Sequence, residues 1–208
     1  MGGFKDLIAY QLSTTIYDLN LAFCQKYIPK TSRTFDQMIQ AARSGKQNIV
    51  EGSLEKSQKL NINLNSVARA SLGELLEDYK DFLRTSGLTL WNKDDPRVLE
   101  IRRFRTDNWS NKTNLTYWAN WTNSSESFAN LMITLISLAS YLLDQLIRKL
   151  ESQFVAKGGY EEKLKERRKR VKGDLDLAKK KEDQDWLENY MKAQGAKKLP
   201  DGRFVKLD

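Results

Sequence analysis

The sequence contains no histidine, and it has a single cysteine, Cys24. The absence of histidine excludes Ser-His-Asp and Cys-His catalysis, and it excludes metal sites that depend on imidazole ligands. One cysteine cannot form a disulfide within the chain, which fits a reducing compartment such as the cytoplasm. Because Cys24 follows Phe23 in an apolar helical pattern, we expect a small buried side chain and not a reactive thiol.

Proline is also scarce, with three in 208 residues, and alternating apolar and polar stretches are few. Both features predict an all-α protein. The apolar periods predict an antiparallel up-and-down four-helix bundle that spans 1–157. Its expected long helices cover about 4–28, 34–56, 58–86 and 124–156. An irregular tryptophan-containing insertion, 88–122, precedes the last of these helices and includes a short helix at 96–105.

The second of these helices carries a stripe of small residues at heptad spacing. Glycine inside a soluble helix costs roughly 1 kcal/mol relative to alanine, so two glycines on one face predict that another helix packs closely there. The residues of this close-packing seam are Ala42, Gly45, Ile49 and Gly52. Capping-box spacing at Thr34 and Gln37 predicts the start of this helix, and the same spacing at Asn123 and Glu126 predicts the start of the last one.

The last of the four helices has two apolar faces. A helix in a four-helix bundle needs one buried stripe, so the second face predicts contact with another chain or with the charged segment that follows. The tryptophans of the insertion are expected to pack onto the bundle or onto a neighbouring subunit. The candidate oligomer contacts are Trp118, Trp121, Ile133, Ile136, Leu143 and Ile147.

The sequence does not predict secretion or membrane insertion. The first twenty residues lack the apolar core of a signal peptide. The five Asn-x-Ser/Thr triplets, which begin at 108, 111, 114, 120 and 123, are therefore expected to stay unglycosylated. The most apolar run, 131–143, is shorter than the roughly 20 residues of a membrane span. We expect no membrane partner.

After Gly158 and Gly159 the chain becomes highly charged, and we expect 158–208 to form a helix and then a short tail with a hairpin at 200–202. Residues 160–208 contain 15 basic and 11 acidic residues, which is half of the net charge of +8. The candidate nucleic-acid-binding residues are Lys163, Lys165, Arg167, Arg168, Lys169, Arg170 and Lys172. These side chains could follow a phosphate backbone, although a solvated charged helix is an equally common alternative.

Three groups of residues carry a resemblance to a known family. They are Gln37, Ala41, Ala42, Ser44, Asn48, Ile49, Glu51 and Gly52; then Ala68, Ser71, Leu72, Glu74 and Leu75; and then Leu142-Leu143-Asp144, Leu150-Glu151, Phe154 and Gly158-Gly159-Tyr160. With these residues the chain resembles the bacterial four-helix-bundle proteins of the 23S ribosomal RNA intervening-sequence type that carry a C-terminal suffix domain. The resemblance implies an up-and-down bundle, association into a ring such as a pentamer, and no enzymatic activity. The family's Arg-Arg pair is Ile39-Gln40 here, so a contact through that pair is lost.

An enzyme would need a cluster of carboxylates, because histidine is absent. Glu51, Glu74, Glu77 and Asp78 are the candidates, and the spacing of Glu74 and Asp78 would let both face one groove, as a metal-dependent nuclease requires. The sequence has no glycine-rich phosphate loop and no nucleophile elbow. We therefore expect no enzyme, no cofactor and no metal site. The expected function is binding of RNA or DNA, and the alternative is a protein-assembly scaffold without nucleic-acid binding.

Overall fold

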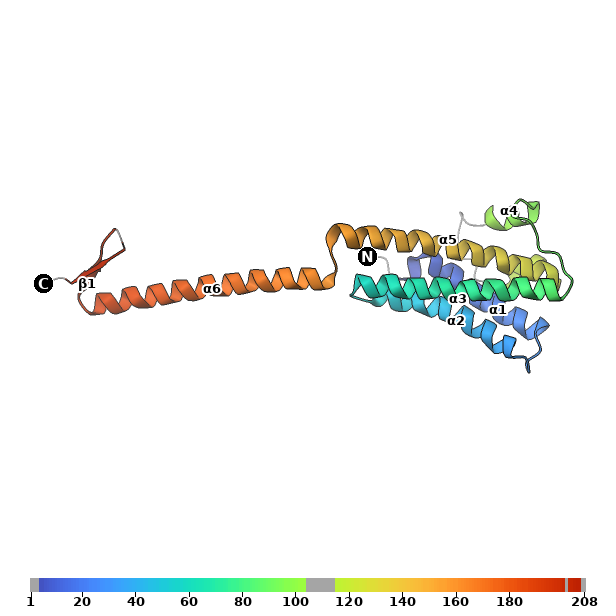
Figure 1. The fold of residues 1–208 in the computed structure, drawn as a ribbon, viewed down its shortest axis with the longest axis horizontal. Coiled ribbons are helices and arrows are strands. Elements are labelled where there is room, and N and C mark those ends of the chain that lie inside the picture. Colours follow the sequence, from blue (N-terminus) through green and yellow to red (C-terminus); the bar gives the residue numbers. More distant parts are fainter. Residues whose placement is uncertain (1–3, 104–114, 201, 207–208) are drawn as a thin grey trace. The chain divides into compact units, whose positions relative to one another are not determined.

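The computed structural model describes residues 4–103, 115–200 and 202–206, and the chain divides into two compact units, Met1–Gly159 and Tyr160–Asp208. Helices dominate the described residues (Figure 1), which confirms the all-α prediction. The first unit contains η1 (Phe4–Asp6), α1 (Ile8–Tyr27), α2 (Arg33–Leu54), α3 (Gln58–Thr85), α4 (Pro96–Arg103), η3 (Leu115–Trp121) and α5 (Ser125–Lys157). The second contains α6 (Tyr160–Ala193) and the antiparallel strands β1 (Ala196–Lys198) and β2 (Phe204–Lys206).

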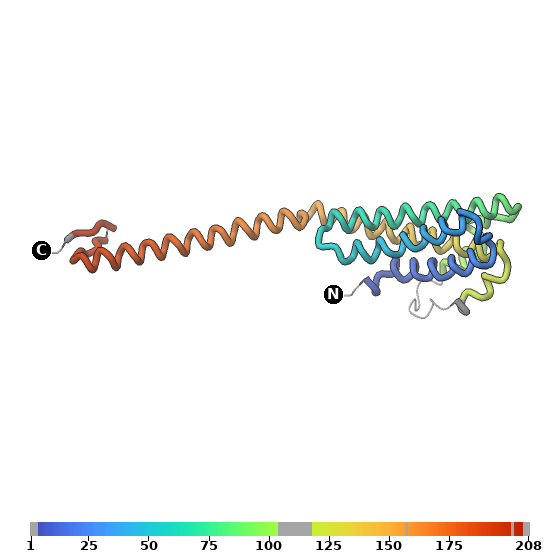
Figure 2. Tube along the Cα trace, turned by 90° about the horizontal axis from the view of Figure 1, so that it is seen from below, coloured from blue at the N-terminus to red at the C-terminus, as the bar shows by residue number. Residues whose placement is uncertain are grey.

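Four long helices of the first unit lie side by side (Figures 1 and 2). Helix α2 packs against α3, α3 against α5, and α1 against both α2 and α5. Each helix turns a stripe of apolar residues inward at a spacing of three or four, as an amphipathic helix requires. On α1 the stripe consists of Leu12, Ile16, Leu19 and Phe23, all at most 2% exposed. These stripes form one hydrophobic core between the helices.

The start of α2 differs from the prediction. The helix begins at Arg33, and its N-cap is Ser32, whose hydroxyl accepts a hydrogen bond from the backbone N–H of Thr34 at 3.2 Å. The predicted capping box at Thr34 and Gln37 is therefore wrong. A serine just before the first turn satisfies a free backbone donor equally well. Helix α3 begins after Ser57, which is its N-cap. Serine is a favoured residue at this position.

The second predicted capping box, at Asn123 and Glu126, is also wrong. Ser124 caps α5, and the carboxylate of Glu126 instead accepts hydrogen bonds from the backbone N–H of Thr89 and from the indole of Trp91. Asn130 on the next turn of α5 reinforces this contact, because its amide donates to the Thr89 carbonyl and accepts from the Trp91 N–H, both at 2.8 Å. These bonds attach the segment before α4 to α5.

A buried polar network links three helices. The phenol of Tyr79 on α3 donates to the side-chain oxygen of Asn20 on α1 at 2.9 Å, and the Asn20 amide donates to the carbonyl of Met38 on α2 at 3.1 Å. Burial holds the pKa of Tyr79 well above its ordinary value. Cys24 lies beside this network and is fully buried, as expected. Desolvation, with a smaller contribution from Asp78, raises the pKa of the Cys24 thiol to about 12, which disfavours the reactive thiolate.

Part of the second apolar face of α5 is buried within the chain itself. Ile136 and Leu143 are fully buried within their own chain. The physical reason is that α5 packs against α1, α3 and α4, so it needs a wider apolar stripe than one face. The prediction that these two residues contact another subunit is therefore wrong. Ile133 and Ile147 are half-buried, and their role as oligomer contacts stays a prediction.

The described tryptophans of the insertion pack onto the chain itself. Trp118 has no exposed surface, which removes it from the candidate oligomer contacts. Trp121 is half-buried, and its ring lies edge-on to that of Trp91, with 6.1 Å between the ring centres. The Asn-x-Ser/Thr triplets that begin at 108, 111 and 114 lie outside the described residues.

One helical stretch of the described residues, within 125–193, includes a segment that is long and apolar enough to cross a membrane by length and composition alone. Of that segment, 44% is buried inside the protein. The core helix of a soluble protein passes the same test, so this finding is weak evidence. The expectation that the chain has no membrane partner stays a prediction.

Candidate functional site

The close-packing seam of α2 lies against α3. A Cβ atom added to Gly45 would lie 2.8 Å from Cδ2 of Leu72, which is closer than a real Cβ approaches any side chain. At Gly52 an added Cβ would lie 3.0 Å from the amide nitrogen of Asn65. Ala42 and Ile49 on the same face have no exposed surface. Side chains of α3 therefore lie directly against the backbone of α2 at these two glycines.

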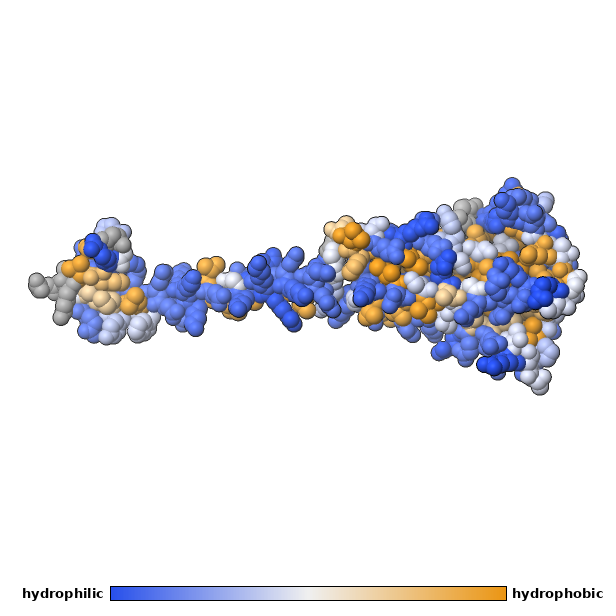
Figure 3. Space-filling view, in the orientation of Figure 1, coloured by the Kyte–Doolittle hydropathy of each residue, from blue (hydrophilic) through white to orange (hydrophobic). Residues whose placement is uncertain are grey.

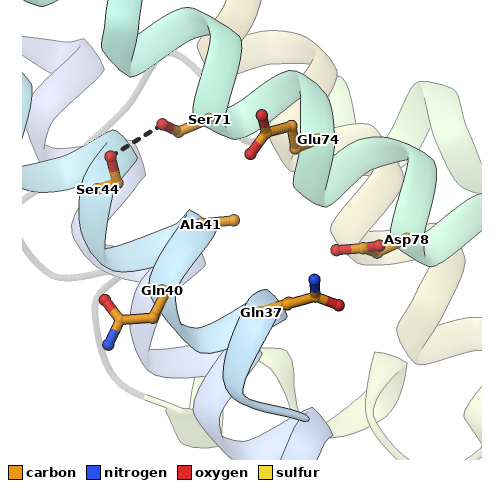
Figure 4. Close-up of a pocket in the computed structure, with 7 residues that line it drawn as sticks. All are labelled: Gln37, Gln40, Ala41, Ser44, Ser71, Glu74 and Asp78. Carbon is orange, nitrogen blue, oxygen red and sulfur yellow. Dashed lines mark hydrogen bonds between the residues drawn. The ribbon is translucent and has the colours of Figure 1, made fainter. Parts of the chain in front are cut away.

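Beside the seam, α2 and α3 border an open polar groove with a volume of about 470 Å³ (Figure 4). Its lining residues are Gln37, Gln40, Ala41, Ser44, Ser71, Glu74 and Asp78. The hydroxyls of Ser44 and Ser71 share a hydrogen bond of 2.9 Å across the groove. Glu74 and Asp78 both belong to the lining, so the structure brings together the two carboxylates that the sequence pairs by spacing.

The chemistry of this groove is limited to two carboxylates, hydroxyls and amides. None of its seven lining residues is basic, so the groove would repel a phosphate. The other candidate carboxylates lie elsewhere: Glu51 is exposed on α2, and Glu77 pairs with Lys80 at 2.7 Å. Within the described ranges, no group of three acidic or cysteine side chains could hold a metal ion.

The acidity of Asp78 in this groove is perturbed. Its partial burial raises the pKa of the carboxyl, and the negative charges of Asp81 and Glu74 raise it further. The ionised carboxylate is therefore less stable in the folded chain than in the unfolded chain. The penalty is absent below the unfolded pKa, where both states are neutral, and it is fully present above the folded pKa.

We expect Asp78→Asn to raise the melting temperature at pH 7, because the amide removes the penalty of burying a charge. The gain should disappear as the pH falls below about 4, near the ordinary pKa of an aspartate. Thermal unfolding followed by circular dichroism at both pH values measures this difference. Glu77→Gln is the matched control on the same helix, and it should bring no gain at pH 7. A lower melting temperature of Asp78→Asn at pH 7 would contradict the assignment.

The basic residues of α6 form the second candidate site. All seven predicted side chains are exposed. Three of them, Lys163, Arg167 and Arg170, line a shallow groove of about 290 Å³ together with Glu166. Their spacing of three or four places them on one face of the helix. We call these three side chains the basic face of α6.

The other four cations, Lys165, Arg168, Lys169 and Lys172, do not line that groove. They are distributed around the same turns of α6, which the structure describes throughout and in which no residue is buried. In the space-filling view (Figure 3) hydrophilic residues cover most of this helix. Exposed arginine and lysine on successive turns can contact phosphates without reading base edges.

Sequence reasoning did not identify an apolar stripe on the same helix. Leu175 and Trp186 are each 64% exposed, and the Trp186 ring stacks on that of Tyr190 with 5.3 Å between centres. The sequence does contain a signal for this stripe. Apolar residues recur every eleven positions, and this spacing places them on one helix face: Leu164, Leu175 and Trp186. The high charge of the segment concealed this pattern.

Comparison with protein-family models, with curated proteins and with solved structures finds no match to this chain. The resemblance to the intervening-sequence family, with the ring assembly that it implies, therefore stays a prediction.

Proposed function

We propose that this chain is a non-enzymatic protein that binds the backbone of RNA or DNA through the basic face of α6. The observation that carries the proposal is the convergence of Lys163, Arg167 and Arg170 on one exposed groove. Four more cations surround it within ten residues, so a phosphate chain meets positive charge from several directions. Such contacts favour affinity without sequence preference, because phosphates carry no base information.

We further propose that the four long helices of the first unit form an antiparallel up-and-down four-helix bundle, and that the protein is a cytoplasmic homo-oligomer. The cyclic order of contacts among α1, α2, α3 and α5 supports the bundle. A ring, such as a pentamer, rests on the family resemblance alone. A ring would repeat the basic face several times, and the summed field would strengthen attraction to a polyanion.

A second candidate function is a protein-assembly scaffold. The exposed Leu175 and Trp186 favour it, because a solvent-exposed tryptophan of this kind is typical of protein interfaces. A scaffold would hold protein partners through the apolar stripe and would show no charge-driven binding to nucleic acid.

A pull-down from the source cell, with and without nuclease treatment, separates the two functions. We expect RNA or DNA to be recovered with the full chain, and we expect nuclease to release most of the proteins that are recovered with it. Recovery of a protein partner that is insensitive to nuclease, together with no nucleic acid, would contradict the proposal and favour the scaffold.

A further inference from the structure

Helix α6 has an unusual combination of length and exposure. It has 34 residues, and the structure, which describes all of them, buries none. Isolated helices in water are only marginally stable, and most helices in proteins depend on the packing of one face. A long helix with an exposed apolar stripe therefore needs a partner to be fully stable.

The charges of α6 are divided along its length. The first part, 163–172, has seven basic residues and one acidic residue. The later part contains Glu182, Asp183, Asp185 and Glu188, and none of its residues between 182 and 188 is basic. Two parallel copies of this helix would place basic residues against basic residues. Two antiparallel copies would place the basic part of each against the acidic part of the other.

One face of α6 has the spacing of a coiled-coil seam. Steps of three and four residues connect its positions, which are Leu164, Arg168, Val171, Leu175, Ala178, Glu182, Asp185 and Asn189. In the structure Leu175, Ala178 and Glu182 form one edge of a shallow groove of about 570 Å³, whose other lining residues, Asp176, Lys179, Asp183 and Trp186, lie off the seam. Four heptads of this spacing are long enough for two helices to pair.

We propose that α6 pairs antiparallel with α6 of a second copy of this chain. In the register that matches the charges, Leu175 packs on the partner's Ala178, and Arg168 faces the partner's Asp185. Because the pair has twofold symmetry, each of these contacts occurs twice. Each α6 contains both a basic part and an acidic part. A second copy of the same helix therefore supplies the opposite charge to each part when the two copies are antiparallel.

The positions beside the seam agree with this register. Asp174 lies opposite the partner's Lys181, which gives a further pair of opposite charges. Lys165 lies opposite the partner's Trp186, whose exposed ring can accept a cation–π contact. Like charges remain only at Lys172 and the partner's Lys179. The charged contacts fix the antiparallel orientation, and the apolar layers contribute affinity.

Lys163 and Arg170 lie away from the pairing seam. Arg167 lies beside the seam, at the position equivalent to Asp174, and faces the partner's Glu188, so pairing covers one edge of the basic face and leaves Lys163 and Arg170 open. The inference therefore does not depend on the proposed function. A variant can lose pairing and keep all seven cations, which makes the two proposals separately testable.

Charge exchange on the nuclease-treated full chain tests the pairing. Arg168→Glu should weaken self-association about 100-fold or more, because two like-charge contacts replace two attractive ones and such contacts cost several kcal/mol. Asp185→Arg should do the same. The double variant Arg168→Glu/Asp185→Arg should restore the parent's association. Light scattering across micromolar concentrations measures the change in mass relative to the 24.1 kDa chain.

Cysteine crosslinking tests the orientation. A mixture of Leu164→Cys and Asn189→Cys chains should form a disulfide between the two different variants, and the buried Cys24 should not interfere. Dominant crosslinking of Leu164→Cys to itself, or no crosslink at all, would overturn antiparallel pairing. In the charge-exchange experiment, two results would also overturn antiparallel pairing. One is a double variant that associates as weakly as the single variants, and the other is single variants that associate like the parent. Asp185→Arg should lose self-association and retain RNA binding. The two measurements therefore report separately on the pairing of α6 and on the proposed nucleic-acid binding.

Discussion

Gly45→Leu is expected to lower the free energy of unfolding by about 1–3 kcal/mol, because overpacking a tight helix contact forces side chains and backbone apart. Even the first added carbon would lie 2.8 Å from Cδ2 and 2.9 Å from Cγ of Leu72. Leu72 has no exposed surface, so it cannot move into solvent to make room. Chemical denaturation of the parent and the variant, followed by circular dichroism, measures the loss.

Gly73→Leu is the matched control. Gly73 lies inside α3, and a Cβ atom added there would meet nothing within 4 Å. Leucine has a higher helix propensity than glycine, so this variant should be neutral or more stable by about 0.5–1 kcal/mol. Equal losses from both variants would show that leucine disturbs these helices generally. The seam at Gly45 would then not be a tight contact between α2 and α3.

Reversing the three charges of the basic face, with Lys163→Glu, Arg167→Glu and Arg170→Glu combined, should weaken binding of single-stranded RNA about 100-fold near 0.1 M salt. The estimate follows from the loss of three phosphate contacts, each of which contributes about 0.7 unit to the salt dependence. The fold should be retained, because all three side chains are exposed. Fluorescence anisotropy with a labelled generic RNA measures the affinity, and circular dichroism verifies the helix content.

The control for this experiment reverses three lysines of the same helix, Lys179, Lys180 and Lys181, which lie outside the basic part of α6 at 163–172. Both variants change the net charge of the chain equally. The control variant should lose less affinity than the basic-face variant by at least about tenfold, because the field of single exposed charges decays within a Debye length. Equal losses would show that net charge, and not the basic face, attracts the RNA.

Most of the helical architecture could be predicted from the sequence, because apolar periodicity and helix-breaking residues act locally. Gly87 illustrates this: it has a positive φ of 66° just after α3, where the sequence predicts a helix stop. The starts of α2 and α5 lie within one residue of the prediction, but their capping residues could not be predicted correctly, since several capping residues compete there. At α5 the competition was decided by Thr89 and Trp91, which use Glu126 as an acceptor and are distant in sequence.

The candidate sites also include features that could be predicted from the sequence and features that could not. The exposed cations of α6 follow from composition, because a segment so charged cannot be buried. The groove between α2 and α3 required the structure, since spacing places Glu74 and Asp78 on one face but does not reveal what lies opposite. The burial of Ile136 and Leu143 within the chain was missed because periodicity does not show how many neighbours a helix has, whereas packing of Trp118 onto the bundle was one of the two expected alternatives. Helix α5 contacts α1, α3, α4 and η3, so its own chain covers part of its second apolar face as well as the first.

The salt dependence of RNA binding by the full chain tests the central claim most directly. If the basic face of α6 binds phosphates, the logarithm of the association constant should fall linearly with the logarithm of salt concentration, with a slope of about −2 or steeper. The slope should become flatter by about two units in the basic-face variant, and different generic RNA sequences should bind with similar affinity. No binding at low salt, or an affinity that does not change with salt, would contradict the account.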